Sequence, residues 1–263
     1  MSTVNPYEYP DPVYRPSKYE PGYFQPVQEF DLFRAIQAPF KSPNWVMNGL
    51  CVLVCTFLSM FVVGSIVLFG YLAEVVDSRS GGKSENWADF SVDRIGEYLL
   101  RGLWGFLWHL IWSIPIFLIS LVPILIVLGL VEASSNGPQP SATLLGAGIG
   151  FSLFALMGIF VLSLIALISM VVATLGNDFL KGANLSLLFG ILGKMWPTIL
   201  YAGILTILTS MALNVIGTIM CGIGLLFTIP WLHMICADIL AQLHDIYVSR
   251  GGESLIANHH DMV

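Results

Sequence analysis

The sequence predicts an all-α, polytopic helical membrane protein with about five transmembrane helices plus interfacial amphipathic helices. Of its 263 residues, 56% are hydrophobic and 11% are charged, and the mean hydropathy is +0.79. A soluble domain usually carries about 25% charged residues, so a soluble core could not enclose this much apolar surface. One long run without a formally charged residue extends from Gly102 to Leu130, and it exceeds the ~20 residues that cross a bilayer core.

The first 44 residues form a segment rich in proline and tyrosine. Residues 1–27 hold six of the fourteen prolines and five of the nine tyrosines, and proline at this density prevents helices and sheets from propagating. We expect a mostly disordered tail that is either a solvated leader or a docking segment through which residues 1–44 bind a protein partner. Residues 28–40 have apolar side chains near helical spacing, which predicts a short interfacial helix.

Residues 45–247 are predicted to form the helical membrane domain, and residues 248–263 a polar C-terminal tail. The spans are expected at about 45–72, 102–131, 142–173, 197–216 and 218–240. An amphipathic segment at 177–196 precedes the fourth span, and Asn177 and Asp178 can cap its first turn.

Three prolines within the apolar runs predict helix breaks at Pro115, Pro123 and Pro230. Each proline removes one backbone donor and so frees one carbonyl group. In lipid, a freed carbonyl needs another partner.

Four polar side chains are candidate intramembrane positions: His109, Asn214, His233 and Asp238. His109 is either a proton or ligand site or, as we favour, a structural hydrogen-bonding group. Asp238 lies about twenty residues into the fifth apolar run. We therefore expect that the helix has already reached the membrane interface at this carboxylate.

Small residues at helical spacing in the third span, Ala142, Gly146 and Gly150, are typical of close helix packing, and we favour packing within the chain over dimerisation. Cys51 and Cys55 share a helix face, but no further ligands lie nearby in the sequence. We therefore expect free thiols and predict no metal site.

The distribution of Lys and Arg leaves the membrane orientation open. With five spans, seven of the eleven basic residues lie on the side of the C-terminus and four lie with the N-terminal tail. If residues 45–72 formed a re-entrant hairpin instead of a span, all eleven would lie on one side, which the positive-inside rule places in the cytoplasm.

One block of motifs resembles a known family. Gly70-Tyr71 is followed by a Gly-containing polar loop, then by Trp87 with Asp89-Phe90, and by Gly102-Leu103 thirteen residues before Pro115. This pattern is similar to the prokaryotic polytopic membrane protein family called domain of unknown function 4013, over about residues 40–247. The resemblance implies a multi-pass protein of a prokaryotic cell membrane, the cytoplasmic or inner membrane, and it carries no catalytic residue.

Motifs for catalysis are missing from the sequence, so we predict neither an enzyme nor a cofactor. No basic stripe with interleaved aromatic residues is present, so nucleic acid is excluded as a partner. We expect a membrane-embedded interaction or organising protein in the lipid bilayer. The alternative is transport of a small solute or ion along a pathway near the Pro115 and Pro230 helix breaks, because broken helices can expose carbonyl groups to a substrate.

Overall fold

A computed structural model describes residues 29–81, 87–136, 142–220 and 224–256, and in these ranges the chain is all helical, without a strand. The α-helices are α1 Leu32–Gln37, α2 Trp45–Leu58, α3 Val63–Arg79, α4 Ile95–Asn136, α5 Ala142–Leu175, α6 Phe179–Ala183, α7 Leu185–Ile219 and α8 Leu225–Ser249. Short 3-10 turns occupy Ala38–Lys41, Ser59–Phe61 and Val92–Arg94.

Four helices, α4, α5, α7 and α8, are long and apolar enough to cross a membrane. A fifth span results if Leu32–Lys41 and Trp45–Phe61, which meet at 102°, are counted as one bent span. The predicted class, an all-α polytopic fold with about five apolar helices, is thereby confirmed.

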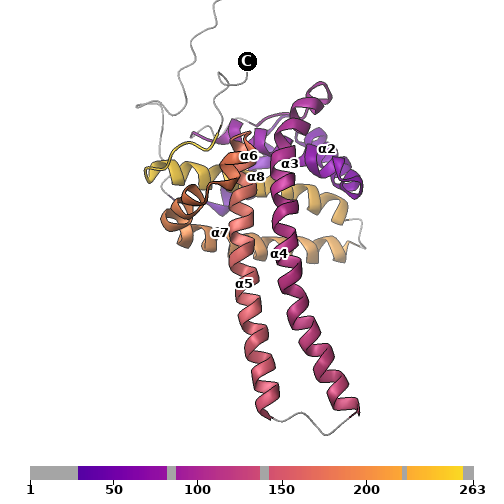
Figure 1. Cartoon of the computed structure of the whole chain (residues 1–263). Coiled ribbons are helices and arrows are strands. Elements are labelled where there is room, and N and C mark those ends of the chain that lie inside the picture. Colours follow the sequence, from indigo (N-terminus) through magenta and orange to yellow (C-terminus); the bar gives the residue numbers. More distant parts are fainter. Residues whose placement is uncertain (1–28, 82–86, 137–141, 221–223, 257–263) are drawn as a thin grey trace, which may run out of the picture.

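Two long helices, α4 and α5, pack side by side as an antiparallel hairpin. The hairpin extends well beyond the other helices (Figure 1). With 42 residues, α4 is about 63 Å long, roughly twice the thickness of a bilayer core. The pair α7 and α8 runs across this hairpin near its other end (Figure 1).

The stretch 45–72 differs from its prediction as one straight span. The chain turns at Ser59–Phe61, and Val62 closes the turn with φ at +64°, a conformation that a β-branched residue rarely adopts. A Cβ atom added to Gly64 would lie 2.3 Å from the carbonyl oxygen of Cys55, so the start of α3 directly contacts the end of α2.

The start of α2 and the later part of α3 are both hydrogen-bonded to residues 88–90. Asn48, in the first turns of α2, accepts a hydrogen bond from the backbone N–H of Phe90 at 3.0 Å. Tyr71, on α3, donates its hydroxyl to the carbonyl of Ala88 at 3.1 Å. Residues 45–72 therefore form a helical hairpin whose two ends lie beside residues 88–90.

The three prolines predicted to break helices lie inside continuous helices. Helix α4 continues through Pro115 and Pro123, and α8 continues through Pro230. A proline removes one hydrogen bond of the helix, but the bonds on either side remain. Near the first proline, the Ser113 hydroxyl donates to the carbonyl of His109 at 2.6 Å.

The predicted amphipathic segment and fourth span are one helix, because α7 runs from Leu185 through Pro197 to Ile219. Asp178 caps the preceding short α6, as predicted, by accepting the N–H of Leu180 at 2.8 Å. The connection between α7 and α8 lies at 220–224, several residues later than the sequence indicates.

The buried core lies at the end of the molecule where α1, α3, α7 and α8 pack together with the start of α4 and the end of α5. Helix α8 contributes the largest share of buried residues and contacts α1, α2, α3 and α7. Core members on four helices include Tyr71, Val76, Tyr98, Val172, Ala237 and Ile246. We call this end of the molecule the head.

Candidate functional site

A buried ion pair joins α3 to α8 in the centre of the head. The Nε of Arg79 donates to Oδ1 of Asp238, and both side chains are fully buried. Removing two charges from water costs several kcal/mol per ion, so such a pair persists only where its geometry and hydrogen bonds compensate. Asp238 thus has its counter-ion inside the protein, and its position near the membrane interface stays a prediction.

The second oxygen of Asp238 is also bonded. The amide nitrogen of Gln242, one turn later on α8, donates to Oδ2 at 2.8 Å. A second guanidinium, that of Arg34 on α1, lies 3.9 Å from the same oxygen through its Nε. One carboxylate of α8 therefore faces two arginines, one from α1 and one from α3.

Gln242 binds the segment that begins at Asp31, just before α1, to α8. Its Oε1 accepts the backbone N–H of Asp31 at 2.8 Å, and its Nε2 donates to the carbonyl of Asp31 at 2.9 Å. Trp231 makes a further link, because its indole N–H donates to the carbonyl of Ile36 at 3.1 Å. The segment predicted to form a short interfacial helix is docked on α8.

The remaining donors of Arg79 face an aromatic ring. Its Nη1 and Nη2 are buried and have no hydrogen-bond partner among the described residues. The guanidinium carbon lies 5.1 Å from the centroid of the Trp87 ring. A tryptophan face attracts a cation at this distance, and this attraction partly replaces the missing hydrogen bonds.

A second buried carboxylate, Asp245, holds the end of α3. Its Oδ1 accepts the backbone N–H of Gly81 at 2.7 Å, and Nδ1 of His244 lies 3.5 Å from the same oxygen. The other ring nitrogen of His244 accepts the N–H of Leu255 at 3.2 Å. Asp238 and Asp245, seven residues apart on α8, therefore anchor α1 and the end of α3 to one helix.

Two glycines of the sequence motif lie where α3 and α4 approach most closely. A Cβ atom on Gly70 would lie 1.9 Å from the carbonyl oxygen of Tyr98, and one on Gly102 would lie 1.9 Å from that of Ile66. Any larger side chain at either position would collide with the backbone of the neighbouring helix.

The aromatic residues of the same motif form one cluster beside this crossing. The ring of Tyr71 packs edge-on against Phe90 and Tyr98, with centroids 5.2 and 5.8 Å apart. The indole N–H of Trp87 donates to the hydroxyl of Tyr71 at 3.3 Å. Because Trp87 also faces Arg79, the motif residues and the ion pair form one continuous structure.

Asp89 ties the loop after α3 to the start of α2. Its carboxylate accepts hydrogen bonds from Ser42, Asn44 and Asn48 at 3.0, 2.7 and 3.0 Å. Partial burial acts to raise the pKa of this carboxyl, but the bonds from Asn48, Asn44 and Ser42 outweigh it and hold the pKa below its ordinary value of 3.8.

The four predicted polar positions do not come together. His109 is exposed on α4. Asn214 is exposed on α7 and donates to the carbonyl of Ser210 at 2.8 Å. His233 bonds within its own helix, with Nδ1 2.9 Å from the carbonyl oxygen of Ile229. Asp238 alone belongs to the buried network.

The predicted packing residues of α5 also lie elsewhere than expected. A Cβ atom on Gly146 or Gly150 would have no neighbour within 4 Å, whereas one on Gly148 would lie 3.2 Å from Ile126 and 3.3 Å from Leu130 of α4. The side chain of Ala142 falls outside the described part. Close packing within the chain therefore uses Gly148, one helix face away from the predicted one.

The chemistry available in the head is that of a cross-link between helices. Both oxygens of Asp238 are occupied, and Gln242 uses both ends of its amide. Over the described ranges, no three His, Cys, Asp or Glu side chains gather where they could hold a metal ion. Cys51, Cys55 and Cys236 are free thiols.

The sequence reasoning missed Arg79, Gln242, Asp245 and Asn48. Arg79, Gln242 and Asp245 lie in polar or mixed stretches where such residues are ordinary, and Asn48 lies near the start of an apolar run, so composition does not mark them. A signal did exist for the aromatic cluster, because Tyr71, Trp87 and Phe90 belong to the motif block.

Comparison with known proteins adds one finding. The model of a family described as "Protein of unknown function (DUF4013)" matches residues 53–237, more than half of the chain. No curated protein and no solved structure matches the chain. The matched range contains both motif glycines and the aromatic cluster, and it ends one residue before Asp238.

Proposed function

Because the chain belongs to the uncharacterised DUF4013 family, we propose that this multi-pass membrane protein binds and organises other membrane proteins and catalyses no reaction. The observation that supports this role is the α4–α5 hairpin, which extends beyond the other helices (Figure 1). Exposed apolar side chains cover its outer faces, among them Phe117, Leu118, Leu125, Phe151, Phe154 and Met157.

An apolar surface of this extent requires lipid or apolar protein as its neighbour. In lipid, helices associate through close van der Waals contact and small residues. Gly146 and Gly150 lie in an open stretch of α5 with no neighbour within 4 Å of their Cβ positions. A helix of another protein can therefore approach the α5 backbone closely there.

The buried polar groups support the same proposal. Asp238, Arg79 and Gln242 are bonded to one another and to α1. This network makes the head a rigid base from which the hairpin projects. A transport pathway would instead use such groups to contact a substrate.

The transport alternative loses the features that motivated it. It rested on helices broken at Pro115 and Pro230, yet both helices continue. His109 lies on the surface and His233 is bonded within α8. No specific feature of the described ranges now favours a solute pathway.

Placement in the cytoplasmic membrane of a prokaryote, with both termini in the cytoplasm, is part of the proposal. It is supported by the fold of 45–72 as a hairpin, which leaves four crossing helices and hence an even number of crossings. The connections 132–141 and 220–224 contain no Lys or Arg, as expected for segments on the outer side.

Site-specific photo-crosslinking in living cells tests the role. A photoreactive residue at Phe154, on the projecting hairpin, should give a discrete adduct with another membrane protein. The matched control is Leu180, which is equally exposed but lies in the head on α6. Adducts with lipid alone at both Phe154 and Phe117 would contradict the proposal.

The contribution of the N-terminal tail is tested by deleting residues 1–28. The deletion stops there because Asp31 and Ile36 are bonded to α8, so a larger one would disturb the head. If the tail docks a partner, the adduct at Phe154 should weaken without loss of folded protein. An unchanged adduct would assign partner binding to the hairpin.

A further inference from the structure

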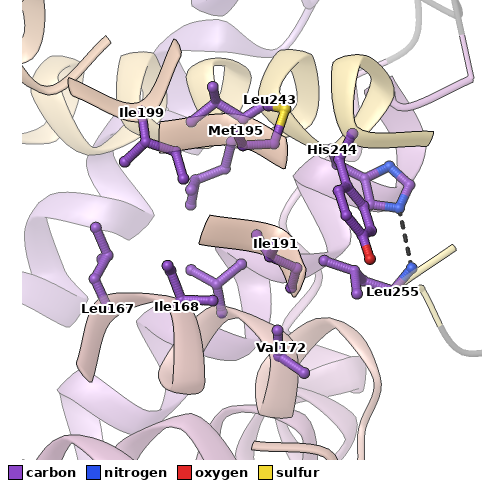
Figure 2. Close-up of a pocket in the computed structure, with 12 residues that line it drawn as sticks. Leu167, Ile168, Val172, Ile191, Met195, Ile199, Leu243, His244 and Leu255 are labelled. Atoms are coloured by element: carbon purple, nitrogen blue, oxygen red, sulfur yellow. Dashed lines mark hydrogen bonds between the residues drawn. The ribbon is translucent and has the colours of Figure 1, made fainter. Parts of the chain in front are cut away.

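An apolar groove runs between α5, α7 and α8 beside the buried network. Ile168 and Val172 form one wall, Ile191 and Met195 another, and Leu243 the third (Figure 2). Its volume of about 70 Å³ holds roughly two water-sized groups, far less than the ~300 Å³ of a typical small-molecule pocket. It therefore fits a short length of alkyl chain and excludes a bulky solute.

The groove is open at Leu167, whose side chain is 45% exposed. At the opposite end, His244 accepts the N–H of Leu255 at 3.2 Å and holds the segment after α8 beside the groove (Figure 2). A chain seated in the groove can therefore continue past Leu167 onto the apolar outer face of α5.

Two basic side chains lie at the polar end of the same groove. The ammonium of Lys194 lies 5.8 Å from the ring centroid of Tyr247 and donates to the carbonyl of Gly251 at 2.7 Å. The Nη1 of Arg250 lies 3.4 Å from the sulfur of Met195 and 2.8 Å from the carbonyl oxygen of Lys194. Tyr247 and Met195 both line the groove.

The two cations are exposed and available to an anion. Neither Lys194 nor Arg250 forms an ion pair with a carboxylate of the described chain. Trp196 follows Lys194 and is 55% exposed, and tryptophan is typical of the headgroup level of a bilayer. Basic groups at this level beside an apolar cleft attract anionic lipid headgroups.

We propose that this groove binds one acyl chain of an anionic phospholipid whose phosphate is held by Lys194 and Arg250. A short length of the chain lies against Met195 and Ile168, and the rest continues past Leu167 along the apolar outer face of α5. This inference concerns a lipid ligand and does not depend on the proposed protein partner.

Native mass spectrometry of the full-length protein in detergent tests the proposal, with phosphatidylglycerol and phosphatidylcholine of identical acyl chains as probes. We expect phosphatidylglycerol to remain bound at a concentration on the order of tenfold lower, because two cations contact its headgroup. The double variant Lys194→Gln/Arg250→Gln should lose this preference while phosphatidylcholine binding stays unchanged.

Two matched controls separate the groove from general effects. Lys41→Gln/Lys181→Gln changes the net charge equally, but neither lysine lines the groove, so the preference should remain. Leu167→Trp should weaken the binding of both lipids, because the larger side chain obstructs the open end of the groove. Val161→Trp, at an exposed position on the same helix, should leave binding unchanged.

Equal binding of the two lipids by the unaltered protein would overturn the proposal. So would an equal loss of preference in the two charge variants, because that result reports net charge alone. A Leu167→Trp variant that binds both lipids normally would show that the acyl chain lies elsewhere.

Discussion

The guanidinium of Arg79 and the carboxylate of Asp238 form an ion pair in which neither side chain is exposed, although 159 residues separate them in the sequence. The pair links the end of α3 to the middle of α8. It also lies between the Trp87 ring on one side and Gln242 on the other. The head is therefore held together by polar bonds as well as by apolar packing.

Breaking this pair should destabilise the protein strongly. Arg79→Met leaves Asp238 buried with one cation fewer, and removing one partner of a buried pair costs about 3–5 kcal/mol. The double variant Arg79→Met/Asp238→Leu should recover much of that loss, since no unpaired charge remains. Thermal unfolding in detergent measures both.

Arg94 supplies the control for this prediction. It pairs with Glu74 and Glu97 near the surface, where ion pairs contribute about 0–1 kcal/mol. Arg94→Gln should therefore change the melting temperature little. A single Arg79→Met variant as stable as Arg94→Gln would show that the buried pair does not stabilise the head.

The glycines at the α3–α4 crossing should not tolerate alanine. A Cβ on Gly70 or Gly102 meets a backbone oxygen at 1.9 Å, and this oxygen moves only with its helix. Overpacking of this kind costs about 1–3 kcal/mol or more, so both variants should lose folded protein. The yield of monodisperse protein after size-exclusion chromatography reports the loss.

Gly96 is the matched control on α4, because its Cβ position has no neighbour within 4 Å. Gly96→Ala should keep or slightly raise the stability, by up to about 1 kcal/mol from helix propensity. If Gly70→Ala and Gly96→Ala behaved alike, the close crossing of α3 and α4 would be wrong.

Asp89 should make stability depend on pH in the acidic range. Its pKa in the folded state lies below the ordinary 3.8, so its stabilising contribution is fully present above that value. The contribution is lost as the pH falls through the lowered folded-state pKa. Comparing melting temperatures of the unaltered protein and Asp89→Asn between neutral and acidic pH isolates this effect.

The difference between the two proteins should shrink as the pH falls, since Asp89 becomes protonated and resembles asparagine. A difference that stays constant with pH would mean that the bonds from Ser42, Asn44 and Asn48 do not favour the ionised carboxylate.

Packing between α4 and α5 should be sensitive at Gly148. Gly148→Leu would push against Ile126 and Leu130, which lie 3.2 and 3.3 Å from the Cβ position. We expect a loss of about 1–3 kcal/mol in stability. Gly146→Leu and Gly150→Leu should leave the stability of the isolated chain nearly unchanged. If these two variants were destabilised and Gly148→Leu were not, helix packing would instead use Gly146 and Gly150, as the sequence predicts.

The class of fold could be predicted because lipid tolerates long apolar runs and every such run is visible in the composition. The α2–α3 turn could not. Its residues, Leu58 to Val63, contain neither glycine nor proline, and Val62 adopts an unfavourable backbone conformation. The contact of Gly64 with the end of α2, rather than local preference, accounts for the turn.

The buried network escaped prediction for a different reason. Asp238 could be recognised as an expensive group, but its position near a helix end indicated the membrane interface. Its partner Arg79 lies in a polar connection that looks solvated, and no periodic pattern links residues so far apart. The motif glycines were identifiable from the resemblance, but their role as a helix crossing required coordinates.

The central position of α8 has a consequence for biosynthesis. Chains emerge from the ribosome with the N-terminus first, so Arg79 and the backbone of Asp31 are made long before Asp238 and Gln242. Until the last helix inserts, the earlier helices carry an arginine without its counter-ion and a loose N-terminal segment. A nascent chain cut short before α8 would thus display the features by which quality-control proteases recognise incomplete membrane proteins.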